Sequence, residues 1–269
     1  MMRNLKTIHE ELIVTVLGTG VYLFAGFAFV PILRVFCESD NIVAYGAFIL
    51  GAIVAIIIAE LAYEKWHEED IHAGILPFSM KAVVFGTIAS FAIANIISGA
   101  RAIAECFVYN DLITASNVGI GFTDWDSFEV IVLVLATCMF GPIAEELLFR
   151  GLLMNSLWKV FGLHKAVILS AICFGVLHGN SVITIVSATF MGIALAYTYA
   201  INRNLLDSII AHLIYNTFVT YVAVHSEVTG AQEIQDISDV LPGILPAILV
   251  STLVLIVLGW IYKRKVLTT

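Results

Sequence analysis

The sequence predicts an all-α, polytopic membrane protein of about eight transmembrane helices. Hydrophobic residues make up 60% of the chain and charged residues only 13%, whereas soluble domains carry about 25% charged residues. The mean hydropathy is +0.98. In addition, several runs approach the roughly 20 apolar residues that a helix needs to cross the hydrocarbon core of a bilayer.

Eight apolar runs, taken in chain order, are the expected spans. Seven are clear, and the fourth is interrupted by Gly141-Pro142. Because Pro is favoured in the first turn of a helix, we expect the fourth span to break there and a new helix to begin. The fifth run is the shortest. The expected spans are 12–33, 42–62, 82–103, 128–158, 166–177, 182–201, 205–224 and 240–262.

The Lys and Arg residues predict that both termini are cytoplasmic, because short loops rich in these residues stay on the cytoplasmic side. With eight spans and an inner N-terminus, Arg34 and Arg101 face outside, and Arg150 lies within the fourth span. The remaining basic residues then lie inside: Arg3, Lys6, Lys65, Lys81, Lys159, Lys165, Arg203, Lys263, Arg264 and Lys265. The compact loops favour a bacterial plasma membrane.

The chain is expected to form one integral-membrane domain, 1–269, because no connection resembles a polar linker between folded units. The net charge of -8 arises mostly from loop carboxylates, so no basic patch indicates nucleic-acid binding. The four cysteines do not make a disulfide framework in a chain of this length. Cys37 and Cys106 lie near outer ends of spans, and whether they pair is left open.

Two adjacent carboxylates, Glu145 and Glu146, lie inside the fourth span, and Arg150 follows Glu146 after one helical turn. An ionisable group near the bilayer centre costs roughly 2.5 to 3.5 kcal/mol on insertion scales, so such groups face a protein interior or a water-filled cavity and mark function. Glu146 and Arg150 can pair at this spacing, which leaves Glu145, about 100° around the helix, to point elsewhere.

Other polar residues lie at a similar depth in later spans. His212 and Asn216 share one face of the seventh span because they are four residues apart. At about 1.5 Å per residue, Glu145, His178 and Asn216 each lie about 20 Å from the nearest cytoplasmic basic residue, and His212 lies one turn closer to that side. If spans 4, 5 and 7 are neighbours, these groups form an interior cluster.

Three motifs of charged and polar residues follow one another on successive spans: EExxxR at Glu145, Glu146 and Arg150, FxxxH at Phe174 and His178, and HxxxN at His212 and Asn216. In this order they resemble the CAAX-protease and bacteriocin-processing (CPBP, Abi) family of intramembrane proteases. The resemblance covers about 141–217. It implies a glutamate-dependent endopeptidase that acts on prenylated CAAX-type peptides or on bacterial leader- or signal-type peptides, with the lipid bilayer and such a substrate as partners.

The chemistry of these residues agrees with that implication. Peptide hydrolysis needs an activated water and hydrogen-bond donors for the developing oxyanion, and a carboxylate in an apolar site is a competent general base. We assign Glu145 as the base and His178 as a second group that holds the water. His212 and Asn216 are expected to supply the oxyanion hole.

Three residues have supporting roles in this hypothesis. Glu146 orients Arg150 or a histidine, although the sequence does not decide which of the two glutamates is the base. Phe174 is expected to pack in the core. No cofactor is expected, and spacing such as CxxC or HExxH is absent from the sequence.

Three alternatives remain open at this point. A zinc ion bound by Glu145, His178 and His212 is chemically possible, and a chelator would distinguish it from metal-free catalysis. A non-hydrolytic membrane protein for bacteriocin immunity or secretion is a second alternative. The third is a proton-coupled transporter, which the absence of an inverted-repeat signal and the single broken helix disfavour.

Overall fold

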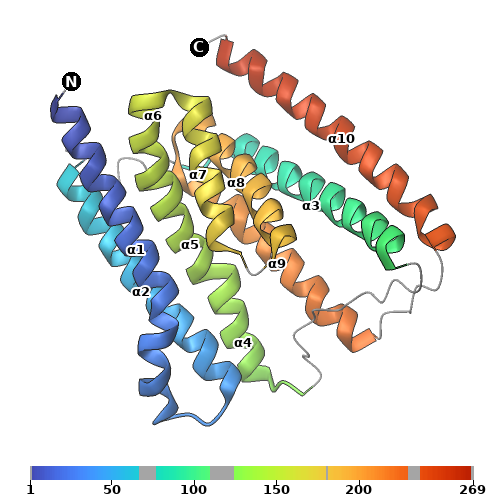
Figure 1. The fold of residues 1–269 in the computed structure, drawn as a ribbon, viewed down its shortest axis with the longest axis horizontal. Coiled ribbons are helices and arrows are strands. Elements are labelled where there is room, and N and C mark those ends of the chain that lie inside the picture. Colours follow the sequence, from blue (N-terminus) through green and yellow to red (C-terminus); the bar gives the residue numbers. More distant parts are fainter. Residues whose placement is uncertain (1, 67–76, 110–123, 180, 230–236, 268–269) are drawn as a thin grey trace.

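The computed structural model describes residues 2–66, 77–109, 124–179, 181–229 and 237–267, and these residues are helical with short connections and no strand (Figure 1). The predicted all-α class is confirmed. Six helical stretches among them are long and apolar enough to cross a membrane: Asp40–Ala62, Met80–Ala104, Ser127–Phe161, Val182–Asn202, Leu205–His225 and Leu241–Arg264. Of two shorter apolar stretches, Ile13–Tyr22 falls within the first predicted span, and Leu163–Leu177 contains the fifth.

The fourth span is the central helix of the molecule, and its segments are α4 (Ser127–Leu135), η2 (Ala136–Phe140), α5 (Gly141–Glu146), η3 (Leu147–Met154) and α6 (Asn155–Phe161). On one side it packs against α1 (Met2–Arg34) and α2 (Asp40–Trp66). On the other side lie α7 (Leu163–Leu177), α8 (Val182–Asn202) and α9 (Leu205–Thr229). Helix α3 (Met80–Tyr109) packs behind α8 and α9, and α10 (Ile237–Leu267) packs against α3 (Figure 1).

The expected break at Gly141-Pro142 is confirmed only in part: the α-helical segment α5 begins at Gly141 with Pro142 in its first turn, but the chain stays helical from Ser127 to Phe161. Instead the backbone widens into the π-helical segment η2 just before Pro142, and the N–H of Gly141 donates to the carbonyl of Ala136, five residues earlier. A proline inside an α-helix clashes with the carbonyl four residues before it. The wider π turn relieves this clash without ending the helix.

Helices α7 and α8 form a tight hairpin, and α7 ends part-way along the length of the central helix (Figure 1). Two glycines allow the close packing. A Cβ atom on Gly175 would lie 2.6 Å from the carbonyl oxygen of Ile185, and one on Gly192 would lie 3.2 Å from the Cα of Ala171. The hairpin therefore brings the end of α7 against the middle of the central helix.

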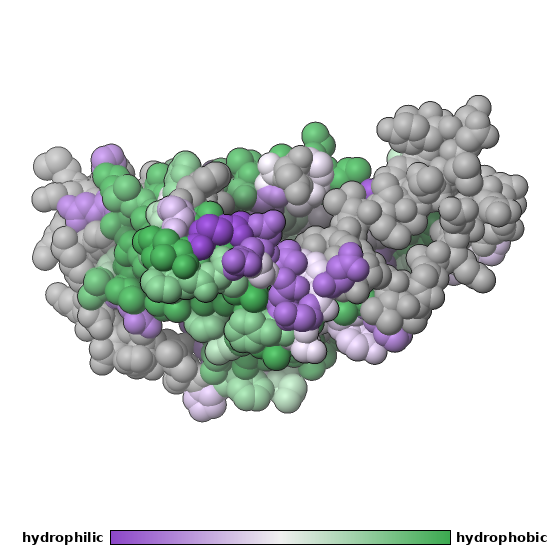
Figure 2. Space-filling model, turned by 90° about the horizontal axis from the view of Figure 1, so that it is seen from below, coloured by the Kyte–Doolittle hydropathy of each residue, from purple (hydrophilic) through white to green (hydrophobic). Residues whose placement is uncertain are grey.

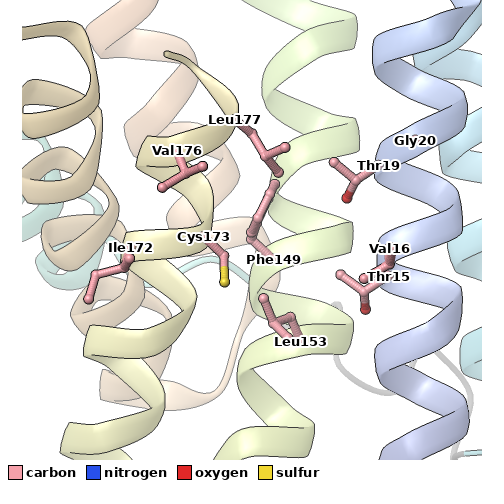
Figure 3. Close-up of a pocket in the computed structure, with 10 residues that line it drawn as sticks. All are labelled: Thr15, Val16, Thr19, Gly20, Phe149, Leu153, Ile172, Cys173, Val176 and Leu177. Carbon is pink, nitrogen blue, oxygen red and sulfur yellow. The ribbon is translucent and has the colours of Figure 1, made fainter. Parts of the chain in front are cut away.

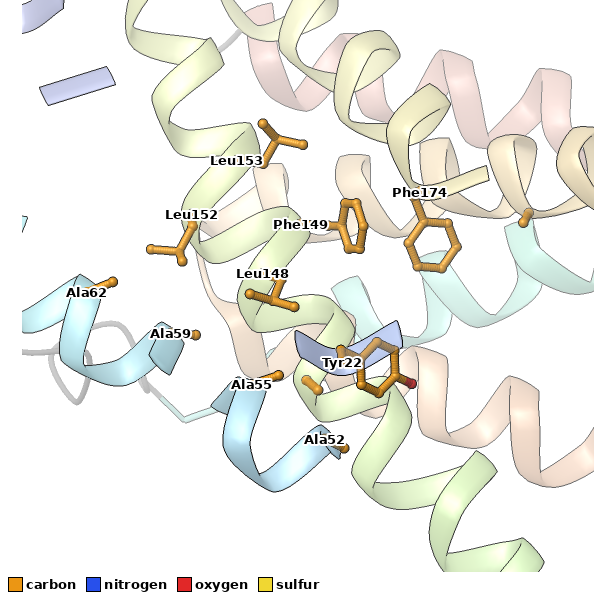
Figure 4. Close-up of a cluster of buried hydrophobic side chains, with 12 residues drawn as sticks. Tyr22, Ala52, Ala55, Ala59, Ala62, Leu148, Phe149, Leu152, Leu153 and Phe174 are labelled. Carbon is orange, nitrogen blue, oxygen red and sulfur yellow. The ribbon is translucent and has the colours of Figure 1, made fainter. Parts of the chain in front are cut away.

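The core between α2 and the central helix is built from small residues on one side and large ones on the other. Ala52, Ala55 and Ala59 of α2 face Leu148 and Leu152 of η3 (Figure 4). Small residues let two helices approach closely in a membrane, where packing rather than the hydrophobic effect drives helix association. This contact fixes the central helix against α2.

The N- and C-terminal helices begin and end at the same end of the bundle (Figure 1). This arrangement agrees with an even number of membrane crossings. Figure 2, which views the molecule from the opposite end, shows hydrophilic residues gathered in a patch beside hydrophobic surface. Cys37, in the connection between α1 and α2, forms no disulfide with a cysteine whose side chain the structure describes, and the side chain of Cys106 lies outside that part of the chain. Which end faces the cytoplasm stays a prediction.

Candidate active site

The three predicted motifs meet part-way along the central helix. Counted from the turn at Gly162, Glu145 lies about 26 Å back along the central helix and His178 about 24 Å along α7, at about 1.5 Å per residue. The two residues are therefore at the same depth, and the structure places the Nε2 of His178 3.8 Å from the Oε2 of Glu145. The predicted neighbourhood of spans 4, 5 and 7 is present in the structure.

Glu146 is buried and makes two close contacts through one oxygen. Its Oε1 accepts a hydrogen bond from Nη1 of Arg150 at 2.7 Å and lies 3.0 Å from Nδ1 of His212. Arg150 also donates from Nη2 to the carbonyl of Gly192 at 3.0 Å, and its guanidinium lies 4.7 Å from the ring centroid of Phe174. The pair therefore joins the central helix to α8 and α9 as well as balancing two buried charges.

Glu145 has different partners. Its Oε2 lies 3.8 Å from Nε2 of His178 and 3.8 Å from Nε2 of His212, while its Oε1 accepts a hydrogen bond from the hydroxyl of Tyr22 at 3.0 Å. The side chain is buried, yet the separation from both imidazoles exceeds that of a direct hydrogen bond. Oε2 of Glu145 therefore faces the Nε2 atoms of both histidines without a direct hydrogen bond to either of them.

The contacts of the two histidines define their tautomers. Nδ1 of His178 lies 2.8 Å from the carbonyl oxygen of Phe174. Because a carbonyl only accepts, Nδ1 carries the proton, and Nε2 of the neutral ring carries a lone pair. By the same reasoning Nδ1 of His212 donates to the Glu146 carboxylate. Phe174, whose ring lies 4.3 Å from that of His178, is fully buried, as expected for a packing residue.

Asn216 contacts the central helix at another point. Its Nδ2 donates to the carbonyl of Thr137 at 2.9 Å. In a π-helix each N–H bonds to the carbonyl five residues earlier, so the N–H of residue 142 would donate to Thr137. Residue 142 is a proline and has no N–H. Asn216 therefore supplies the donor that Pro142 lacks. The sequence analysis placed Asn216 at the depth of Glu145. In the structure it is His212, one turn earlier on α9, that lies beside both glutamates.

Tyr22 is the contact that the sequence reasoning missed, because the first span carries no recognised motif. A signal was present in its pattern. Thr15, Thr19 and Tyr22 recur at helical spacing on one face of an otherwise apolar helix, and all three are buried. A buried polar face on a membrane helix indicates contact with polar groups of a neighbouring helix.

An apolar cavity of about 430 Å³ lies beside the site, between α1, η3 and α7. Thr15 and Thr19 line it from α1, Phe149 from η3, and Cys173 and Leu177 from α7 (Figure 3). Phe149 is one turn from Glu145, and Leu177 precedes His178. Two of the residues that line the cavity are therefore near neighbours of site residues in the sequence.

In the part of the chain that the structure describes, no group of three His, Cys, Asp or Glu side chains is arranged to hold a metal ion. Fold and site together define a polytopic α-helical membrane protein with a buried carboxylate beside two imidazoles, one of which hydrogen-bonds a second, arginine-paired carboxylate.

Comparison with known proteins agrees with this class. Residues 127–218, from α4 to α9, match the family model described as type II CAAX prenyl endopeptidase Rce1-like. This segment contains all seven motif residues. The resemblance to the CAAX-protease and bacteriocin-processing family that the motifs predict is therefore confirmed.

A curated protein of Bacillus subtilis (strain 168), described as "Putative membrane peptidase YdiL", is 31% identical over 90 residues. The match covers 34% of this chain and 36% of that protein, so this chain spans about a third of the relative's length. No solved structure matches the chain.

Proposed function

We propose that this protein is an intramembrane endopeptidase that hydrolyses a peptide bond with a water activated by Glu145. The observation that carries the proposal is the position of the Glu145 Oε2, 3.8 Å from the Nε2 atoms of both His178 and His212. The family match and the description of the Bacillus relative support peptidase chemistry in general. The glutamate mechanism and the substrate are inferred from the site.

The arrangement suits a shared water. Groups 3.8 Å apart are too far for a direct hydrogen bond, but one water can lie about 2.8 Å from each of them. Such a water donates one O–H to Glu145 Oε2 and the other to the lone pair on His178 Nε2. Both acceptors raise the electron density on the water oxygen, which is the atom that must attack.

Hydrolysis then proceeds in two steps with one proton carrier. The water oxygen forms a bond to the peptide carbonyl carbon, its proton moves to Glu145, and the carbonyl oxygen becomes an oxyanion. The C–N bond then breaks, and Glu145 returns the proton to the leaving amine. A single carboxylate that acts first as base and then as acid needs no nucleophilic side chain.

Stabilisation of the oxyanion falls to His212 and Asn216 in this proposal. His212 donates from Nδ1 to Glu146, so a second donor at Nε2 requires the imidazolium form. Asn216 uses one amide N–H for Thr137 and has a second that can point at the substrate. Glu146 and Arg150 hold His212 in place.

The expected substrates are prenylated CAAX-type peptides or bacterial leader- or signal-type peptides. The expected location is a bacterial plasma membrane, with several spans and both termini in the cytoplasm. Comparative peptidomics tests the proposal. Membranes that carry wild type should release peptides with new termini that are absent when the same amount of Glu145→Gln is present. Identical peptide profiles would contradict the proposal and favour a non-hydrolytic role.

A further inference from the structure

Tyr22 reaches the site from a helix that carries none of the motifs. It lies on α1, outside the segment 127–218 that matches the family, and its side chain is only 6% exposed. Its hydroxyl donates to Oε1 of Glu145 at 3.0 Å. Among the described residues, Tyr22 is the one partner with which the Glu145 carboxylate forms a hydrogen bond.

Three helices define where this hydroxyl lies. The Tyr22 ring packs on Phe48 of α2, with 4.8 Å between ring centroids. Gly141 of α5 leaves space for both groups, because a Cβ atom there would lie 3.2 Å from the Tyr22 hydroxyl oxygen and 3.2 Å from Cε1 of Phe48. Figure 4 shows Tyr22 between α2 and the central helix, near Ala52 and Ala55. The hydroxyl is therefore held in place by its packing.

A fixed donor on one oxygen orients a carboxylate. The terminal torsion of a glutamate is broad and roughly two-fold, so the two oxygens exchange places easily in the absence of a partner. Tyr22 occupies Oε1, which leaves Oε2 facing His178 and His212. Preorganised geometry of this kind matters because small displacements of a reacting group cost large factors in rate.

We propose that Tyr22 is a positioning residue that holds the Glu145 carboxylate with Oε2 toward His178, which shares the water in the proposed mechanism, and toward His212. This inference rests on the proposed function, since it assigns Tyr22 a role in the orientation of the general base. It also gives α1 a part in the site, although α1 lies outside the segment that resembles the family.

The test compares Tyr22→Phe with wild type on a peptide that wild type cleaves, each as the whole 269-residue chain purified into nanodiscs. Phenylalanine keeps the ring against Phe48 and removes only the hydroxyl. Loss of a hydrogen bond to a charged group predicts a fall in kcat of about 10- to 100-fold, with KM changed by less than about twofold. Rates are normalised to the monodisperse protein recovered.

Tyr199→Phe is the matched control. The Tyr199 hydroxyl is also buried and donates to Oδ1 of Asn155 on the same central helix, at 2.8 Å, outside the site. Its loss should leave kcat within about twofold of wild type. A purely structural role for Tyr22 predicts instead that both variants lose thermal stability to the same extent and keep their turnover.

Glu145→Gln, measured beside them, distinguishes the two proposals. An inactive Glu145→Gln together with wild-type kcat in Tyr22→Phe would overturn the positioning role alone. An active Glu145→Gln would overturn the proposed function and the positioning role with it. In the Glu145→Gln background, removal of the Tyr22 hydroxyl should have no further effect on the residual rate.

Discussion

Nδ1 of His212 lies 3.0 Å from Oε1 of Glu146, the same oxygen that accepts a 2.7 Å hydrogen bond from Arg150. This oxygen is committed to two partners inside the protein. Glu145, one residue earlier, instead turns Oε2 toward two ring nitrogens at 3.8 Å. The two glutamates therefore have different contacts. In the proposed mechanism Glu146 orients His212 and neutralises Arg150, and Glu145 faces the reacting water.

The first prediction concerns stability. Glu146→Ala should lower the melting temperature more than Glu145→Ala does, because it leaves Arg150 buried without its carboxylate. Removal of one partner from a buried ion pair costs about 3 to 5 kcal/mol, whereas Glu145 has no arginine hydrogen-bonded to it. Thermal unfolding of the purified variants in one detergent measures the difference. Equal melting temperatures would show that the Glu146–Arg150 pair adds little to stability.

The second prediction concerns Asn216 and the carbonyl of Thr137. Asn216→Ala leaves this carbonyl without a donor and should destabilise the protein by about 1 to 3 kcal/mol. Pro142→Ala restores a backbone N–H at the position that reaches Thr137 in the π-helical register. Asn216→Ala should therefore cost less in the Pro142→Ala background than in wild type.

A double-mutant cycle on the unfolding free energies measures this coupling. Thr217→Ala, at the exposed neighbouring position, is the control and should show no coupling to Pro142→Ala. Additive effects of Asn216→Ala and Pro142→Ala would contradict the assigned role of the amide.

The third prediction concerns metal. If Glu145 and His178 activate the water directly, exhaustive chelation should leave turnover unchanged and elemental analysis should find no stoichiometric zinc. Loss of activity with a chelator, followed by recovery on addition of zinc alone, would replace the metal-free mechanism with a site built on Glu145, His178 and His212.

The fourth prediction concerns orientation in the membrane. In a variant with Cys106→Ser, Cys138→Ala and Cys173→Ala, the native Cys37 should react with an impermeant thiol reagent added to intact cells. In the variant that also lacks Cys37, a cysteine introduced by Lys165→Cys should react only after the membrane is opened. The reverse pattern would invert the topology that the basic residues predict.

The sequence predicted the helical class and most of the residues that lie together in the candidate site, because both predictions depend on local rules. Apolar runs of sufficient length predict spans, and four-residue spacing predicts the Glu146–Arg150 pair. The π-helical register around Pro142 was not predictable in this way, since it depends on a donor from α9, Asn216, that supports the freed carbonyl.

The choice of base and its orientation could not be read from the sequence either. Glu145 and Glu146 are adjacent and chemically identical, and only the positions of His212 and Arg150 in space distinguish their contacts. The Tyr22 contact joins residues far apart in the chain. Its polar face on α1 was visible in the sequence, but nothing in that pattern identified the helix that it would face.

The central claim is that Glu145 is the general base and Glu146 is not. The most direct measurement is the turnover of purified Glu145→Gln and Glu146→Gln in nanodiscs on one cleaved peptide, per mole of folded protein. We predict that Glu145→Gln loses at least about 100-fold in kcat while its melting temperature stays near that of wild type, and that Glu146→Gln retains measurable turnover with a lower melting temperature. Wild-type turnover in folded Glu145→Gln would contradict the account.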